Sequence, residues 1–467
     1  MATLTIPAAI WREYDVRGVA GTDLTPELAR LLGYAFAQLA RARGAGREVV
    51  VGRDNRVSSP ELARGVIEGI RAAGLGVCDL GQVTTPVFYF ARLHLGIEPG
   101  IMVTASHNPG RENGFKLALG RGTLVGQDIT DLGAAVRGLA AEGLPERTPA
   151  TSPLRTADVL PDYYADMAAR VRLARPLHVV VDCGNGTASP ISPEVFRRLG
   201  CRVTELFCVS DPTFPNHHPD PVRPENLQAL IAEVRRLGAD LGIGIDGDGD
   251  RIGAVADDGR ILWGDELMML FWREILPRYP QSAVLVEVKC SQALWDDAVA
   301  HGGRPFFHRT GHSHIKATLY ARNLPFAGEL SGHLFFHDEF PGYDDATYAG
   351  ARLARLVAAG SRPLSALAGE LPRYPATPEV RVACADDVKF QVVERLQRMF
   401  AAGHDVVTVD GARVLWDDGW GLIRASNTQP VLVLRAEGRT EAALRAICGR
   451  LEEALRAQPE VGPVSWT

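Results

Sequence analysis

The residues best suited to chemistry lie in one short stretch, Asp246-Gly247-Asp248-Gly249-Asp250-Arg251. Three carboxylates alternate with glycines there, and alternate side chains of an extended chain point to one side. The glycines let the chain bend so that the carboxylates converge, and converging anions favour a divalent cation among them. We expect Mg²⁺ rather than Ca²⁺, because three carboxylates leave an octahedral ion open to a phosphate oxygen and to water.

Two other interpretations of this stretch compete with a magnesium site. Asp-Gly repeats also form plain surface turns. The calcium loop between two helices also begins with acids at positions one, three and five. That loop needs Gly at position six, where Arg251 stands, and Glu at position twelve, where Asp257 stands. It also follows a helix, whereas the small and β-branched residues 239–245 predict a buried strand.

A second polar stretch, Thr104-Ala105-Ser106-His107-Asn108-Pro109, follows another expected strand and precedes Asn113-Gly114-Phe115-Lys116. Open α/β sheets place their chemistry at the carboxyl ends of strands. Ser106 is the hydroxyl there that has a possible acid–base partner, His107, and a nearby cation, Lys116. The alternative interpretation is an Asx-type turn without chemistry.

Two further stretches have the composition of sugar-phosphate sites. Glu329, Ser331 and His333 alternate, so an extended backbone would place them on one face, where they could bind sugar hydroxyls. A solvated hairpin rim is the alternative. Near the C-terminus, a fork-shaped guanidinium with hydroxyls and loop amides would suit a phosphate dianion, unless the stretch is a plain turn. The residues of this predicted clamp are Arg424, Ser426, Asn427 and Thr428.

Composition limits the class of protein. A chain of 467 residues is too long for one ordinary core, and 46% apolar with 23% charged residues is typical of a soluble globular protein. A net charge of −6 without a basic block argues against nucleic acid as the main partner. The seven cysteines lack CxxC spacing, and neither a membrane-spanning run nor a signal-peptide pattern is present. We therefore expect a reduced, cytoplasmic enzyme that does not bind membranes.

The expected elements alternate between strands and helices over most of the chain, which predicts mixed or mainly parallel sheets covered by helices. Stretches containing proline near 139–152 and 371–378 interrupt this alternation. The last hundred residues differ, with a hairpin at 406–415, and predict an α+β domain of helices and a small antiparallel sheet. The expected domains are residues 1–152, 153–255, 256–372 and 373–467.

Taken together and in this order, the four stretches resemble the α-D-phosphohexomutases, and most closely the bacterial phosphomannomutase/phosphoglucomutase group. The resemblance covers essentially the whole chain. It implies four domains around a central cleft, of which three share an α/β core with mixed sheets and the fourth is a C-terminal α+β cap.

The resemblance also implies a role for each matching residue. Ser106 matches the serine that carries the transferable phosphoryl group. Asp246, Asp248 and Asp250 match the Mg²⁺ ligands, with an oxygen of phospho-Ser106 as a further ligand. The groups that match the polar residues around the transferring phosphoryl group are Arg17, His107, Lys116 and Arg251. His312 matches a substrate contact of the third domain and is, with His107 and Lys116, a candidate for acid–base work. The groups that match substrate contacts are Lys289, Glu329, Ser331, His333, Arg424, Ser426, Asn427 and Thr428.

The implied reaction interconverts hexose 1-phosphate and hexose 6-phosphate of glucose, mannose or both. Phospho-Ser106 would phosphorylate the sugar, and the resulting hexose 1,6-bisphosphate would turn over and return its other phosphate. Mg²⁺ is the implied cofactor, glucose 1,6-bisphosphate the activator, and a monomer or homodimer the implied assembly. Leu330 and His314 depart from residues common in the dual-specificity group and could shift the sugar preference.

Four alternatives stay open. A non-enzymatic sugar-phosphate sensor would keep the clamp and lose the serine or an aspartate, yet all of them are present. Phosphoglucosamine mutases usually carry Gln where Leu330 stands and Gly-Thr-Glu-Pro where Asn427-Thr428-Gln429-Pro430 stands. At these positions the chain is more similar to the glucose and mannose enzymes. A metal-dependent sugar-phosphate phosphatase would use water instead of a sugar hydroxyl. An ATP-using sugar kinase is weakly supported, because the sequence has neither a P-loop nor a Gly-rich nucleotide loop.

Overall fold

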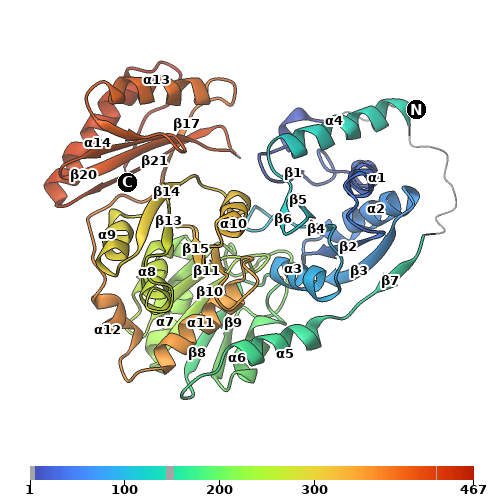
Figure 1. The fold of residues 1–467 in the computed structure, drawn as a ribbon, viewed down its shortest axis with the longest axis horizontal. Coiled ribbons are helices and arrows are strands. Elements are labelled where there is room, and N and C mark those ends of the chain that lie inside the picture. The colour runs from blue at the N-terminus through green and yellow to red at the C-terminus, as the bar shows by residue number, and fades with distance from the viewer. Residues whose placement is uncertain (1–5, 144–151, 428, 467) are drawn as a thin grey trace. The chain divides into compact units, whose positions relative to one another are not determined.

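The computed structural model describes residues 6–143, 152–427 and 429–466. The chain forms two compact units. Figure 1 labels the helices and strands that belong to them. Unit 1 comprises residues 1–263 and 331–367, and unit 2 comprises residues 264–330 and 368–467. Within the described ranges, no helix has both the length and the apolar character needed to cross a membrane.

The first part of unit 1 is built on a mixed sheet. Its strands are β1 (Val16–Val19), β2 (Glu48–Arg53), β3 (Gly76–Gln82), β4 (Gly100–Val103), β5 (Glu112–Leu119), β6 (Gly122–Thr123) and β7 (Leu154–Thr156). Its helices are η1 (Ala8–Ile10), α1 (Pro26–Ala42), α2 (Ser59–Ala72), α3 (Thr85–His94) and α4 (Gln127–Glu142). The strand order is β1-β5-β4-β2-β3-β7, with β6 beside β5. Strands β2, β3, β4 and β7 are parallel, whereas β5 runs antiparallel to β1 and β4.

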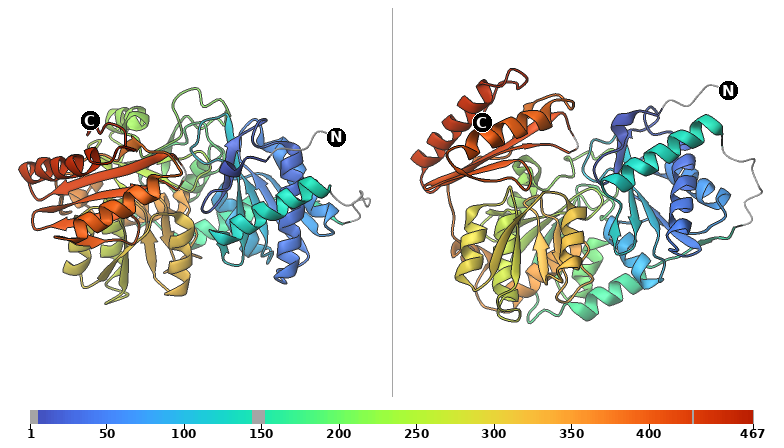
Figure 2. Two further views of the ribbon diagram at one scale, coloured as in Figure 1. Left: turned by 90° about the horizontal axis from the view of Figure 1, so that it is seen from above. Right: turned by 45° about the horizontal axis from the view of Figure 1, so that its top comes forward.

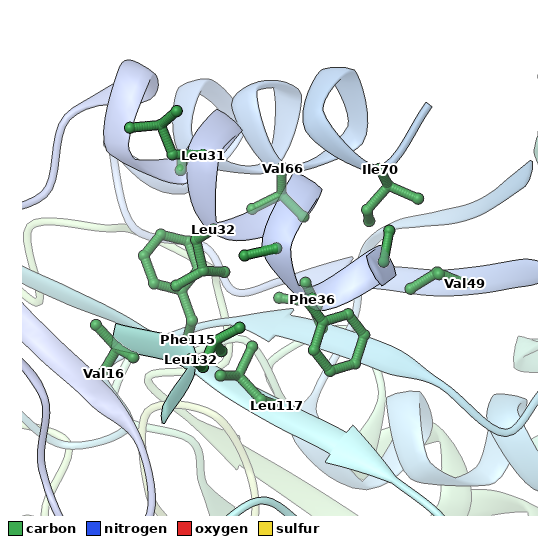
Figure 3. Packing of buried hydrophobic residues seen from close by; sticks show 14 of the residues in the cluster. Val16, Leu31, Leu32, Phe36, Val49, Val66, Ile70, Phe115, Leu117 and Leu132 are labelled. Carbon is green, nitrogen blue, oxygen red and sulfur yellow. The ribbon is translucent and has the colours of Figure 1, made fainter. Parts of the chain in front are cut away.

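Helices α1 and α2 cover one face of this sheet. Leu32 and Phe36 of α1 and Val66 of α2 pack with Phe115 of β5 in one buried cluster (Figure 3). Burial of each large apolar side chain there stabilises the fold by about 1.5–3 kcal/mol. Because neighbouring side chains of a strand point to opposite faces, Phe115 on the helix-covered face directs Lys116 to the other face.

The second part of unit 1 contains a sheet with the order β12-β11-β10-β8-β9. The strands of this part are β8 (His178–Asp182), β9 (Arg202–Leu206), β10 (Leu241–Ile245), β11 (Ile252–Ala256), β12 (Ile261–Leu262) and the short β16 (Leu334–Phe336). The helices are α5 (Leu160–Arg170), α6 (Ser192–Arg198), η2 (Pro224–Leu227), α7 (Gln228–Leu237) and α11 (Ala346–Ala358). Strands β8, β9 and β10 are parallel, and the chain then turns back so that β11 is antiparallel to β10.

Unit 2 begins with a small α/β part. Its strands are β13 (Ala283–Glu287), β14 (Arg304–His308) and β15 (Phe326–Gly328), and its helices are α8 (Gly264–Ile275), α9 (Gln292–Ala300) and α10 (His312–Ala321). Strands β13 and β14 pair in parallel. The chain returns to this unit at Ala368, within helix α12 (Leu364–Gly369).

The C-terminal part of unit 2 is an antiparallel sheet with the order β17-β21-β20-β19-β18. Its strands are β17 (Val380–Ala383), β18 (Asp405–Val407), β19 (Ala412–Trp416), β20 (Gly419–Ala425) and β21 (Val431–Gly438), and its helices are α13 (Lys389–Ala401) and α14 (Glu441–Arg456). Both helices pack on one face of the sheet (Figure 2). The predicted hairpin at 406–415 is confirmed as β18–β19.

The other face of this sheet packs on the first part of unit 2. Trp420 and Leu422 contact Val288, and the buried Arg413 donates hydrogen bonds to the carbonyl oxygens of Val288 (2.6 Å) and Cys290 (2.9 Å). The predicted α/β fold with mixed sheets and a C-terminal α+β domain is thus confirmed.

Candidate active site

The three aspartates predicted to bind metal lie in the loop between β10 and β11. One oxygen of Asp246 accepts hydrogen bonds from the backbone nitrogens of Gly249 (3.0 Å), Asp250 (3.0 Å) and Arg251 (3.1 Å), which closes the loop. Gly249 has φ of +85°, a conformation that other residues rarely adopt. At Gly247, a Cβ atom would lie only 2.5 Å from the carbonyl oxygen of Ser106. The glycines therefore allow both the bend and the close approach of the serine loop.

The loop geometry fits a cation. Asp246, Asp248 and Asp250 are at most 1% exposed, and each offers a carboxylate oxygen within 4.8 Å of the others. Among the described residues, the buried Oδ1 atoms of Asp248 and Asp250 accept no hydrogen bond. Such orphaned acceptors are costly unless a cation or water binds them. The donor set consists of hard oxygen atoms, which suits Mg²⁺ or Ca²⁺.

Buried cations partly neutralise these aspartates. The ammonium group of Lys116 lies 2.8 Å from Asp248 Oδ2 and 2.5 Å from Asp250 Oδ2. The guanidinium of Arg251 contacts Asp246 Oδ2 at 3.1 Å and Asp220 Oδ1 at 3.2 Å. Because these contacts are buried, each loop carboxylate depends on its partners for stability.

The pKa values of these groups diverge with their environments. Burial, followed by the charges of Asp248 and Asp250, raises the pKa of Asp246 to about 7. Burial alone would raise the pKa of Asp248, but the Lys116 ammonium overcomes this effect and lowers it. Burial likewise opposes the charge of Lys116, but Asp248 and Asp250 raise its pKa well above the ordinary value. Lys116 is therefore a cation at neutral pH.

Ser106 lies in the loop after β4 and reaches the loop that carries Asp246, Asp248 and Asp250. Its Oγ donates a hydrogen bond to Asp246 Oδ2 (2.7 Å) and lies 3.2 Å from His107 Nδ1. Ser106 has φ of +52°, the left-handed region that non-glycine residues seldom occupy. Such backbone strain clusters at functional sites, where the surrounding structure holds it in place.

Besides Asp246, the surroundings of Ser106 include the cation Arg17 and the imidazole of His107. Arg17 donates to the Ala105 carbonyl oxygen (3.3 Å) and to Asn108 Oδ1 (2.9 Å). Burial, followed by the charges of Arg251 and Arg17, lowers the pKa of His107 well below its ordinary value. His107 is therefore a neutral imidazole that can accept a proton.

Two residues of this site were not predicted from the sequence. The fully buried Arg56 donates to the carbonyl oxygens of Ser106 (2.8 Å) and Asn108 (2.6 Å) and so holds the serine loop. Thr85 Oγ1 donates to Asp248 Oδ2 (2.6 Å). Both follow the carboxyl end of a strand of the first sheet, which is the signal that could have identified them.

The stretch from Glu329 to His333 differs from the prediction. We expected an extended segment with three side chains on one face, but the backbone forms a turn between β15 and β16. Gly332 has φ of +86°, and a Cβ atom there would lie 2.2 Å from the Ile252 carbonyl oxygen. The expected extended backbone is therefore wrong, because the segment turns and only glycine fits beside Ile252.

The turn also distributes its residues between the two units. Glu329 belongs to unit 2, whereas Ser331 and His333 belong to unit 1. His333 Nδ1 lies 2.9 Å from Asp344 Oδ2 and 3.7 Å from Asp250 Oδ1. His333 thus lies beside Asp250, one of the three aspartates between β10 and β11, and beside Asp344.

Unit 2 carries a second group of polar residues. Lys289, after β13, pairs with Glu379 at 3.2 Å, and Arg424 on β20 pairs with Asp410 at 3.1 Å. Glu329 Oε1 accepts a hydrogen bond from the Gly311 nitrogen at 2.8 Å. The Lys289 ammonium lowers the pKa of Glu379 to about 2. Burial opposes the charge of Arg424, but Asp410 overcomes this effect and raises the arginine pKa.

The remaining predicted residues also lie in unit 2. His312 is the buried first residue of α10. Ser426 follows β20, and Lys389 donates to its carbonyl oxygen at 2.5 Å. Asn427 lies in the bend after Ser426, and Thr428 falls outside the described residues. The predicted site residues within the described ranges are therefore divided between unit 1, which contains Ser106, and unit 2, which contains Arg424.

Comparisons with known proteins identify the family of the chain. Four family profiles described as phosphoglucomutase/phosphomannomutase match the chain in order. They are alpha/beta/alpha domain I at residues 8–136, domain II at 161–259, domain III at 263–374 and the C-terminal domain at 379–454.

Individual relatives match nearly the whole chain. A phosphomannomutase/phosphoglucomutase of Pseudomonas aeruginosa is 42% identical over 464 residues, which are 99% of this chain and 98% of the relative. A probable phosphoglucosamine mutase of Methanothermobacter thermautotrophicus is 37% identical over 92% of this chain and 94% of its own length. A crystal structure of a phosphoglucomutase/phosphomannomutase family protein from Burkholderia thailandensis has a TM-score of 0.90 at 40% identity, covering 98% of this chain and 100% of that one.

The chain therefore belongs to the phosphoglucomutase/phosphomannomutase family of α-D-phosphohexomutases. It is an enzyme of the mutase class, and it interconverts hexose phosphates.

Proposed function

We propose that this enzyme interconverts the 1-phosphate and 6-phosphate of glucose, of mannose or of both, through phospho-Ser106. The observation that carries the proposal is the position of Ser106 Oγ, 2.7 Å from Asp246 and next to three converging carboxylates. A serine alcohol is a poor nucleophile unless a base assists it and positive charge screens the approaching anion. Both requirements can be met by the groups of unit 1.

In the first step, phospho-Ser106 gives its phosphoryl group to a free hydroxyl of the hexose phosphate. The bond between phosphorus and Ser106 Oγ breaks and a bond to the sugar oxygen forms. The proton of the sugar hydroxyl passes to a basic side chain, and Ser106 Oγ takes up a proton to become a free hydroxyl. The hexose 1,6-bisphosphate then reorients in the site, and the reverse transfer returns its other phosphate to Ser106. Phosphoryl transfer asks the protein mainly for alignment and neutralisation of charge.

Asp246, Asp248 and Asp250 would hold Mg²⁺, together with an oxygen of phospho-Ser106. When bound, Mg²⁺ supplies charge neutralisation for the transferring phosphoryl group. Lys116, Arg17 and Arg251 add fixed positive charge, and Lys116 stays protonated because its pKa is raised. The neutral His107, 3.2 Å from Ser106 Oγ, is better suited than Lys116 to accept a proton. His312 is a further acid–base candidate.

The polar residues of unit 2, together with Ser331 and His333 of unit 1, would bind the part of the substrate that does not react. Arg424, with Ser426, Asn427 and Thr428, would hold the unreactive phosphate, and Lys289 would add a second cation. Glu329, Ser331 and His333 would bind sugar hydroxyls. These sets must accept the sugar in two orientations, because either phosphate can be the one that reacts. Glucose 1,6-bisphosphate would act as the activator that phosphorylates Ser106.

Coupled assays with glucose 1-phosphate, mannose 1-phosphate and glucosamine 1-phosphate test the substrate. We expect turnover of glucose 1-phosphate and mannose 1-phosphate, which Ser106→Ala and removal of divalent metal should abolish. Turnover of glucosamine phosphate alone would make the enzyme a phosphoglucosamine mutase. Release of inorganic phosphate without isomerisation would make it a phosphatase. The cytoplasmic location, the monomeric or homodimeric state and the four domain boundaries stay predictions.

A further inference from the structure

Asp410 occupies a central position among the polar residues of unit 2. It lies in the Asp-Gly turn that connects β18 to β19, and its side chain is 11% exposed. One oxygen, Oδ2, accepts two hydrogen bonds. Arg424 Nε donates one at 3.1 Å, and the backbone nitrogen of Thr310 donates the other at 2.9 Å. A single carboxylate oxygen therefore links β20 to the segment that precedes α10.

The Thr310–Gly311 segment continues this network to two further carboxylates. The hydroxyl of Thr310 donates to Glu287 Oε1, and the nitrogen of Gly311 donates to Glu329 Oε1 at 2.8 Å. Asp410, Glu287 and Glu329 thus hold two consecutive residues in place. Through this segment, the position of Asp410 is connected to that of Glu329.

The turn that carries Asp410 is itself held firmly. Gly411 has φ of +90°, and a Cβ atom there would lie 2.5 Å from the Ile423 carbonyl oxygen and 2.6 Å from Arg424 Cβ. Gln397 of α13 donates a hydrogen bond to the Gly411 carbonyl oxygen at 2.7 Å. The turn therefore packs directly on the strand of Arg424, so the carboxylate of Asp410 has a fixed position.

We propose that Asp410 is a positioning residue that sets both the phosphate-binding and the sugar-binding contacts of the enzyme. The inference rests on the proposed function, in which Arg424 binds the unreactive phosphate and Glu329 binds sugar hydroxyls. Asp410 engages the Nε atom of Arg424, and the two terminal nitrogens do not take part in that bond. A guanidinium held in this way can present its terminal nitrogens to a phosphate dianion.

A role in positioning and a role as a mere counter-charge predict opposite effects. If Asp410 acted only through its charge, its removal would make the surroundings of Arg424 more positive, and phosphate would bind more tightly. If it acts by position, loss of the acceptor frees both Arg424 and the Thr310 nitrogen, and the substrate binds more weakly.

Three substitutions separate position from charge. Asp410→Asn can keep an oxygen at the Oδ2 position without the charge, Asp410→Glu keeps the charge but displaces it by one methylene group, and Asp410→Ala removes the acceptor. We expect KM for glucose 1-phosphate to rise about tenfold or more in Asp410→Ala and severalfold in Asp410→Glu, but less than about threefold in Asp410→Asn. Asp405→Asn, on the exposed start of the same hairpin, is the matched control and should leave KM unchanged.

Binding of glucose 1-phosphate measured by calorimetry should follow the same order as KM, while kcat changes less. A purely structural role would lower the melting temperature and the active fraction without this order. Unchanged KM in Asp410→Ala and Asp410→Glu, or a lower KM in Asp410→Asn, would overturn the inference. If Asp410→Ala does not fold, the Asp410→Asn and Asp410→Glu variants still distinguish a role in positioning from a role as a counter-charge. Failure of the proposed function would appear separately, as a wild-type enzyme that does not isomerise glucose 1-phosphate.

Discussion

Replacement of Lys116 by methionine removes the cation that lies between two buried aspartates. Its ammonium group is 2.8 Å from Asp248 and 2.5 Å from Asp250, and all three side chains are at most 3% exposed. Removal of one partner from a buried ion pair costs about 3–5 kcal/mol, because the other charge is left without compensation. We therefore expect Lys116→Met to lower the free energy of unfolding by about that amount in the absence of divalent metal.

Bound metal should reverse part of this loss. A ligand that binds only the folded state stabilises it by about 2.7 kcal/mol at a concentration one hundred times its Kd. Without Lys116 the aspartates present more uncompensated negative charge, so Mg²⁺ should stabilise the variant more than the wild type. The difference between the two proteins should therefore shrink as Mg²⁺ is added.

Urea unfolding in EDTA and at increasing Mg²⁺ concentrations measures this effect. The control is Lys116→Met combined with Asp250→Asn, which removes one of the carboxylates left without a partner and should recover part of the stability in EDTA. A loss of less than about 1 kcal/mol in EDTA, or a loss that saturating Mg²⁺ does not change, would refute the reasoning. Isomerase activity should fall with Lys116→Met under all metal concentrations.

The remaining predictions concern protonation and a buried arginine. Because the pKa of Asp246 is raised to about 7, its carboxyl proton must leave before metal binds. The Mg²⁺ affinity measured by calorimetry should therefore fall about tenfold for each pH unit below 7. A Mg²⁺ affinity that is constant from pH 5 to 7 would contradict this prediction. Burial raises the pKa of Asp345 from 3.8 to about 7, so the folded state binds its proton more tightly than the unfolded state does. The resulting stability is complete below pH 3.8 and is lost as pH rises through 7. Between pH 4 and 8 the wild type should therefore lose about 4 kcal/mol more than Asp345→Asn in chemical denaturation, and parallel curves would refute the assignment. Arg413→Met leaves the buried carbonyl oxygens of Val288 and Cys290 without their hydrogen-bond donor. It should therefore lower the free energy of unfolding by about 3 kcal/mol. A change below about 0.5 kcal/mol would show that Arg413 does not stabilise the fold.

The features that the sequence predicted well are local. The loop from Asp246 to Arg251 converges because glycines and alternating carboxylates act within six residues, and the strand before it follows from its apolar composition. The hairpin at 406–415 was likewise predictable, because its Asp-Gly turn selects the connection. Such features depend on neighbouring residues, so a single sequence contains the information.

The features that the sequence did not reveal depend on distant contacts. Arg56 holds the loop of Ser106, some 50 residues away, and nothing in its own surroundings indicates that partner. Alternation of Glu329, Ser331 and His333 suggested an extended strand, but Gly332 packs against the Ile252 carbonyl oxygen and bends the chain. Alternation indicates a shared face only where the backbone remains extended, and tertiary packing decides that.

The proposed reaction depends most directly on Ser106 as the carrier of the phosphoryl group. Intact mass and peptide mapping of the segment around Ser106, before and after exposure to glucose 1,6-bisphosphate, test this claim. We predict a gain of one phosphoryl group on Ser106, its loss when hexose phosphate is added, and no gain in Ser106→Ala. Interconversion of sugar phosphates by an enzyme whose Ser106 is never phosphorylated would contradict the account.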